Sequence, residues 1–165
     1  MPSLILDSHQ VHQKLERIAL EILERTSEHN HVLLAGIQTS GFAIAKLIAR
    51  YLKSFSEKEL TVYSVQLDKT QPLNHPVVTN ISSELLSQAT LIIIDDVQNS
   101  GRTLSYALMH FLQFPVYSVQ TCVLIDRRHN KFPVKPDYIG LSLSTTLQEH
   151  VEVLVDGDNI SVMLH

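Results

Sequence analysis

The chain has 165 residues, of which 44% are hydrophobic and 18% charged, and its net charge at pH 7 is −4. This length suits one domain with a sizeable core, and the charge excludes a uniformly basic surface that would attract nucleic acid. The single cysteine, Cys122, excludes an internal disulfide and lies in an apolar run typical of buried packing. No apolar run reaches the roughly 18 residues of a membrane span, and the first residues show no signal-peptide pattern. We therefore expect a cytoplasmic protein that does not bind membranes.

The first predicted element is a helix. Apolar residues recur at helical spacing from Val11 to Ile22, and Asp7 followed three residues later by Gln10 is a pattern that caps a helix start. The next segment, HVLLAGI at 31–37, is apolar almost throughout, as in a strand covered on both faces.

The middle of the chain continues this alternation of helices and strands. Helical spacing predicts two further helices, and short apolar runs predict three further strands. The predicted helices cover 41–52 and 101–112, and the predicted strands cover 60–67, 90–94 and 116–126.

The end of the chain follows another pattern. VEVLV at 151–155 and ISVML at 160–164 alternate around the turn sequence DGDN, which predicts a hairpin. Together, the elements predict an α/β fold with a mostly parallel twisted sheet, helices on both faces and a C-terminal hairpin. We see no repeat or linker and expect a single domain over residues 1–165.

The stretch LIIIDDVQNSGRT at 91–103 is the strongest functional signal. Ligands of open α/β sheets bind beyond the carboxyl ends of the strands, where Asp95 and Asp96 follow an apolar run. A glycine and a helix start come next, and the free N–H groups of a helix start favour an anion. The stretch therefore predicts a phosphate cradle beside a carboxylate pair, and the cradle residues are Asn99, Ser100, Gly101, Arg102 and Thr103.

Simpler interpretations of the two aspartates fit the sequence less well. A single Asp after a strand usually caps a turn, but here there are two. A nucleoside triphosphatase would need a phosphate loop, and the segment 36–43 has Phe42 and Ala43 where Lys and Ser or Thr are required. A response-regulator receiver carries its acidic pair at the end of the first strand, whereas here several elements come before it.

The same stretch resembles the phosphoribosyl-pyrophosphate (PRPP) signature of type I phosphoribosyltransferases. The resemblance extends to the PyrR family of pyrimidine-operon attenuators that are also uracil phosphoribosyltransferases. GIQTSGFAIAKLIA, which begins at Gly36, is similar to that family's pyrophosphate loop and helix, and 123–146 is similar to its segment after the signature strand. The likeness spans nearly the whole chain.

The resemblance implies a role for each matching position. Asp95 and Asp96 would be the catalytic pair, binding the ribose hydroxyls directly or through Mg²⁺, and residues 99–103 would hold the 5′-phosphate. The pyrophosphate would meet the backbone amides of Thr39, Ser40 and Gly41. The base region would include Asp126, Arg127, Tyr138 and Ile139, with Tyr138 favoured as a packing residue over a residue that stacks on the base.

Three departures from the family pattern affect function. Gln38 and Ser40 replace the Lys and Arg of the family's pyrophosphate loop. The mobile loop that follows Leu-Asp-x-Thr in the family is shortened after Thr70 and lacks its Arg. Asn130 and Leu141 stand where the family's RNA-binding face has cations.

The resemblance implies a Mg²⁺-dependent transfer of phosphoribose from PRPP to uracil, giving UMP and pyrophosphate, in a homo-oligomer that is a dimer or larger. The departures favour a second function, that of a weakly catalytic or non-catalytic regulator that senses PRPP or a nucleotide. RNA binding stays open, because four cations of 126–135 form either a solvated face or a phosphate contact. These cations are Arg127, Arg128, Lys131 and Lys135.

Overall fold

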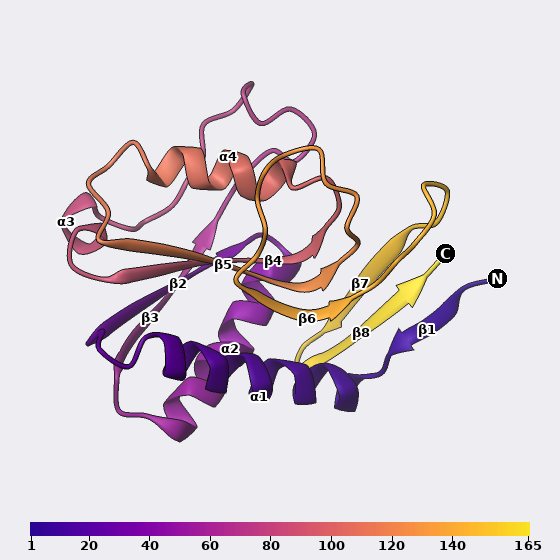
Figure 1. Ribbon diagram of the computed structural model, residues 1–165, viewed down its shortest axis with the longest axis horizontal. Coiled ribbons are helices and arrows are strands. Elements are labelled where there is room, and N and C mark those ends of the chain that lie inside the picture. Colours follow the sequence, from indigo (N-terminus) through magenta and orange to yellow (C-terminus); the bar gives the residue numbers. More distant parts are fainter.

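A computed structural model describes residues 1–165. Its centre is a five-stranded parallel sheet with the strand order β3-β2-β4-β5-β6 (Figure 1). The strands are β2 (His31–Ile37), β3 (Glu59–Val65), β4 (Thr90–Gln98), β5 (Ser118–Asp126) and β6 (Tyr138–Ser142). β2 is buried along nearly its whole length, which explains its continuous apolar run.

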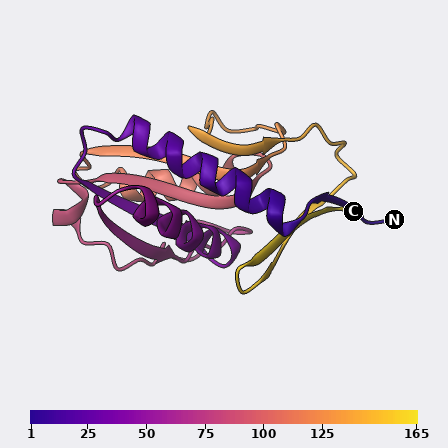
Figure 2. The same ribbon diagram turned by 90° about the horizontal axis from the view of Figure 1, so that it is seen from below.

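Helices cover both faces of this sheet. On one face lie α1 (Ser8–Arg25) and α2 (Ser40–Phe55), whose apolar residues join one core cluster. On the other face lie α3 (Ser83–Leu86) and α4 (Arg102–Phe111), which join a second cluster (Figures 1 and 2). The predicted α/β architecture is confirmed.

The start of α1 follows the capping pattern in its sequence. The carboxylate of Asp7 accepts the N–H of Gln10 at 2.8 Å, and the side chain of Gln10 accepts the N–H of Asp7 at 2.9 Å. Residues at helical spacing are then fully buried against the sheet. No helix of the chain combines the length and the apolar character needed to cross a membrane.

A small antiparallel sheet stands at one end of the molecule, where both termini lie (Figures 1 and 2). It has the order β1-β8-β7 and contains β1 (Ser3–Leu6), β7 (Val151–Asp156) and β8 (Asn159–Leu164). Strands β7 and β8 form the predicted C-terminal hairpin around Gly157, whose φ is +57°. This hairpin turn is held to α2 by Arg50, whose guanidinium donates two hydrogen bonds to Asp158.

The structure adds elements that the sequence patterns did not predict, namely β1, β6 and the single turn α3. It also extends β4 from Ile94 to Gln98. The extension follows from the unequal lengths of the neighbouring strands. Pairing with β2 ends at Ile94, whereas pairing with β5 continues to Gln98.

Candidate functional site

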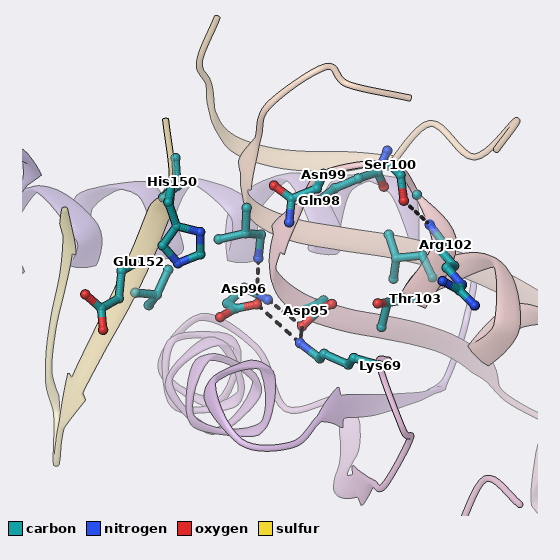
Figure 3. A pocket seen from close by; sticks show the side chains of 15 residues that line it. Lys69, Asp95, Asp96, Gln98, Asn99, Ser100, Arg102, Thr103, His150 and Glu152 are labelled. Atoms are coloured by element: carbon teal, nitrogen blue, oxygen red, sulfur yellow. Dashed lines mark hydrogen bonds and ion pairs between the residues drawn. The ribbon is translucent and has the colours of Figure 1, made fainter. Parts of the chain in front are cut away.

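A cleft of about 490 Å³ opens at the carboxyl end of β4. Its floor is the last part of β4 and the first turn of α4, and one wall comes from β7 (Figure 3). Asp95 and Asp96 lie on β4 just beyond the point where pairing with β2 stops. The unequal strand lengths therefore place both carboxylates at an open sheet edge.

The two aspartates have different surroundings because successive strand residues point to opposite sides. The Asp95 side chain is only 2% exposed, and its Oδ1 accepts the N–H of Asp96 at 2.9 Å. The Asp96 side chain is 19% exposed, and its Oδ1 accepts the N–H of Val97 at 2.7 Å. Asp95 is thus enclosed, whereas Asp96 faces the cleft.

Lys69, which follows β3, brings an ammonium group to both carboxylates. Its Nζ lies 3.0 Å from Oδ1 of Asp95 and 3.6 Å from Oδ1 of Asp96. Burial, and after it the charge of Asp96, raises the pKa of Asp95 to about 7, although Lys69 acts in the opposite direction. For Lys69, burial lowers the pKa, but attraction to Asp95 and Asp96 outweighs burial and the net shift is upward. The ion pair therefore favours the charged form of Lys69, which keeps part of its hydration. It does not fully offset the cost of ionising Asp95, which keeps almost none.

The predicted phosphate cradle forms the turn between β4 and α4. Gly101 has a φ of +86°, a left-handed conformation that glycine adopts without a steric penalty. The Ser100 hydroxyl accepts the N–H of Arg102 at 3.2 Å, and the Ser100 carbonyl accepts the N–H groups of Lys131 and Phe132. A helix start behind a fixed glycine turn is a suitable place for a phosphate.

The cradle is braced from behind by further contacts. The Ser105 hydroxyl donates to the Gly101 carbonyl at 2.6 Å, so this side chain supports the turn. The Arg127 guanidinium is buried and donates to Oδ1 of Asn99 at 2.8 Å. It also donates to the Thr145 hydroxyl and to the carbonyls of Thr146 and Glu149. Arg127 therefore ties the cradle to the segment that leads into β7.

Other residues expected at the base lie farther from the cleft. Asp126 ends β5, and its carboxylate accepts the N–H of Arg128. Tyr138 is fully buried in the core cluster on the α1 face, and its hydroxyl donates to Gln120 at 2.7 Å. Ile139 packs against the other cluster. The structure does not bring Tyr138 or Ile139 into the cleft.

The predicted pyrophosphate residues begin α2 on the other side of Asp95. Thr39 is the residue before the helix, and Ser40 and Gly41 form its first turn. A Cβ atom on Gly41 would lie 2.7 Å from the Ile94 carbonyl oxygen and 3.0 Å from Cα of Asp95. The backbone of α2 therefore lies directly against the carboxylate pair, and only glycine allows this approach.

Three titratable residues that the sequence patterns did not single out also line the cleft, namely Lys69, His150 and Glu152. Lys69 follows a parallel strand at the same sheet edge as the aspartates, which is a usable signal once the strand order is known. His150 and Glu152 belong to the small sheet, and Glu152 contacts His165 at 2.8 Å. No local pattern places that sheet over β4.

Comparison with known proteins identifies the family. Residues 3–156 match the model of the phosphoribosyl transferase domain. The chain belongs to the phosphoribosyltransferase family. It is 33% identical to the bifunctional protein PyrR of Elusimicrobium minutum, over 99% of this chain and 97% of that protein. It is 31% identical to the protein of the same name from Actinobacillus succinogenes, over 93% of this chain and 91% of that one. The resemblance read from the sequence is confirmed.

Solved structures of phosphoribosyltransferases share the fold. A hypoxanthine-guanine phosphoribosyltransferase from Bacillus anthracis superposes with a TM-score of 0.79 at 16% identity, covering 98% of this chain and 96% of that one. The hypoxanthine phosphoribosyltransferase of Trypanosoma cruzi superposes with a TM-score of 0.77 at 15% identity, covering 97% and 95%.

The two carboxylates at the end of β4 are donors of a kind that suits a magnesium ion. The chain contains no cluster of three or more His, Cys, Asp or Glu side chains placed to hold a metal. The site instead offers two carboxylates, and these already attract the Lys69 ammonium. Mg²⁺ commonly binds through one or two carboxylates while substrate phosphates and water complete its shell.

Proposed function

We propose that this protein transfers the phosphoribosyl group from PRPP to uracil, giving UMP and pyrophosphate, with Mg²⁺ held by Asp95 and Asp96. The observation that carries the proposal is the cleft itself, in which a carboxylate pair and a phosphate cradle follow one another along β4 and α4. Membership of the phosphoribosyltransferase family supports the reaction class. The choice of uracil as the base rests on the sequence resemblance to the PyrR family, to which the relatives named PyrR are also assigned.

Each part of the cleft then has one task in the reaction. The turn at 99–103 binds the 5′-phosphate, and the aspartates orient the ribose through its hydroxyls. A nitrogen of the base forms a bond to C1 of the ribose while the bond from C1 to the pyrophosphate oxygen breaks, and the proton of that nitrogen is taken up by the departing pyrophosphate. Bound Mg²⁺ would neutralise charge on the departing pyrophosphate. The reaction depends on positioning of the ribose and on electrostatic stabilisation of its developing positive charge more than on a strong base. The carboxylates supply both.

The second candidate is a regulator that binds PRPP or UMP with little or no catalysis. The specific observation in its favour is the neutral start of α2, where Gln38 and Ser40 offer no cation to the leaving pyrophosphate. Loss of one well-placed electrostatic donor typically lowers a rate about a hundredfold. We therefore expect slow UMP formation rather than none.

One assay tests the proposal and separates the two functions. Purified protein is incubated with Mg²⁺, PRPP and each of uracil, hypoxanthine, guanine, adenine and orotate. We expect slow formation of UMP alone, faster turnover after Gln38→Lys with Ser40→Arg, and loss of PRPP binding after Asp95→Asn with Asp96→Asn. PRPP binding without any nucleotide product, even with both cations restored, would favour the regulator. Unchanged affinity in the aspartate variant would overturn the site assignment.

RNA binding is a weaker part of the proposal. Of the four cations at 126–135, Arg127 is buried and occupied by hydrogen bonds within the chain. Arg128, Lys131 and Lys135 are exposed. Each phosphate contact contributes about −0.7 to −0.9 to the slope of log affinity against log salt. We expect weak binding to leader-type RNA hairpins, with a slope no steeper than about −3.

A further inference from the structure

The position between the two site carboxylates is already taken by a cation of the chain itself. The Lys69 ammonium lies 3.0 Å from Asp95 and 3.6 Å from Asp96, and no other cationic side chain forms an ion pair with either of them. Figure 3 shows the Lys69 side chain reaching both carboxylates. A cation that binds the two carboxylates from the cleft must therefore compete with the Lys69 ammonium.

The backbone around Lys69 is fixed, so the contact is a product of the fold. The Asp68 carboxylate accepts the N–H groups of Thr70 and Gln71 at 3.0 and 2.9 Å, which closes a turn around Lys69. The chain on either side is joined where Gln66 pairs with Val78. These contacts constrain the backbone at Lys69 and so direct its side chain toward the carboxylate pair.

The side chain of Lys69 is nevertheless free to leave. It is 41% exposed, whereas the Asp95 side chain that it contacts is 2% exposed. An ammonium on a flexible stem regains its hydration when it swings into water, but the buried carboxylate cannot follow it. The backbone of α2 closes the opposite side of Asp95, because even a Cβ on Gly41 would lie 3.0 Å from its Cα.

We propose that Lys69 is a displaceable internal counter-ion, which holds the cation position of the free protein and is released when a divalent cation binds Asp95 and Asp96. This inference rests on the proposed function, because it takes these aspartates as the metal-binding pair. The ammonium and the metal compete for the same carboxylate oxygens. The free protein therefore binds a divalent cation weakly, and the cation enters together with a sugar phosphate that supplies further ligands. The freed ammonium then faces an anionic substrate in a cleft where Arg102 is the only other Lys or Arg.

The test measures metal binding to the ligand-free protein, with Mn²⁺ used as a paramagnetic probe in place of Mg²⁺. Free Mn²⁺ is quantified by electron paramagnetic resonance in the wild type, Lys69→Met, Lys69→Arg and Lys53→Met. Lys53 is an exposed lysine in the last turn of α2 and serves as the control. We expect Lys69→Met to bind Mn²⁺ at least tenfold more tightly than the wild type. Lys69→Arg and Lys53→Met should stay within about twofold, because the first keeps a competing cation and the second never had one at the site.

A second variant assigns any gain in affinity to the carboxylate pair. The double variant with Asp96→Asn and Lys69→Met should lose the tighter Mn²⁺ binding of Lys69→Met. If the tighter binding persists in the double variant, Mn²⁺ binds elsewhere and the inference is wrong. If the wild type and Lys69→Met bind Mn²⁺ with equal affinity, Lys69 does not compete with the metal and the counter-ion inference is wrong, whereas the assignment of the metal site still stands. If neither protein binds Mn²⁺, even with PRPP present, the metal assignment of the proposed function fails and the inference fails with it. Circular dichroism of each variant confirms that the comparison is between folded proteins.

Discussion

Replacing Asp95 by asparagine should make the protein more stable at neutral pH, although it damages the site. Burial raises the pKa of this carboxyl from its ordinary value of 3.8 to about 7. At 1.36 kcal/mol for each pKa unit, ionising Asp95 in the folded protein costs up to about 4 kcal/mol relative to the unfolded chain. An asparagine side chain at this position carries no such cost, because an amide does not ionise.

The direction of the pH dependence follows from the raised pKa. Below about pH 4 the carboxyl is protonated in both states and costs nothing. Between about pH 4 and 7 the unfolded chain ionises first, so the free energy of unfolding of the wild type falls as pH rises. The new amide donates two hydrogens that need acceptors, which subtracts about 1–3 kcal/mol from the gain at every pH. Because this loss does not depend on pH, it cancels from the comparison between pH values. The stability of Asp95→Asn relative to the wild type should therefore increase by up to about 4 kcal/mol from pH 4 to pH 8.

Urea denaturation at pH 4, 5, 6, 7 and 8 measures this difference. For a chain of this length 1 kcal/mol shifts the melting temperature by about 2–4 °C, so thermal unfolding would show the same trend. Asp156→Asn is the matched control, because Asp156 lies exposed at the end of β7 and its replacement should leave the pH profile unchanged. If the curves of Asp95→Asn and the wild type run parallel across this range, Asp95 does not carry an unfavourable charge and the reasoning is wrong.

Three further predictions test the surroundings of the site. Gly101→Ala forces a side chain into a φ of +86° and should lower the free energy of unfolding, measured in urea, by about 1–2 kcal/mol. The same variant should bind UMP more weakly when its affinity is measured by calorimetry. Gly157→Ala should cost similar stability with unchanged UMP affinity, because it has a φ of +57° at an open turn; equal loss of affinity in both variants would misplace the cradle. Arg127→Met removes four hydrogen bonds from a buried guanidinium and should cost about 2–4 kcal/mol in urea, and a loss below about 0.5 kcal/mol would contradict its bracing role. Arg50 lowers the pKa of Asp158 from its ordinary value of 3.8 through its hydrogen bond. Arg50→Ala should therefore reduce the melting temperature at pH 6, and the reduction should shrink as the pH falls below 3.8 and Asp158 takes up its proton; a reduction that does not change with pH would exclude the ion pair as its cause.

The sequence predicted those parts of the fold that depend on local patterns. The helix from Ser8 to Arg25 was visible because its cap and its apolar face lie in one continuous segment. Strands β1 and β6 were missed because they have four and five residues and are defined by partners far along the chain. The last residues of β4, from Asp95 to Gln98, are mostly polar, and only pairing with β5 makes them a strand.

The same distinction explains which site residues were found. Asp95 and the cradle that ends at Thr103 are contiguous, so their chemistry can be read directly from the chain. Lys69 reaches the cleft only because β3 lies in the same parallel sheet. Tyr138 belongs to the expected base region but is favoured as a packing residue, and it is indeed buried, at the first residue of β6. Ser142, at the other end of that strand, is the residue that pairs with Asp126 at the carboxyl edge of the sheet. The position of Tyr138 depends on the direction of β6, a strand that the sequence patterns do not predict.

The carboxylate pair makes sense as a functional feature because folding stability alone disfavours it. An apolar residue at position 95 would continue the buried run from Leu91 to Ile94, at no electrostatic cost. The chain instead keeps a buried aspartate whose pKa is raised, and it places Lys69 beside it on a turn held by Asp68. Strongly perturbed groups in a cleft are typical of sites where a ligand uses them. Lys69 offsets part of this cost and is itself partly exposed, so the same contact that stabilises the aspartate in the free protein can be exchanged for a bound cation.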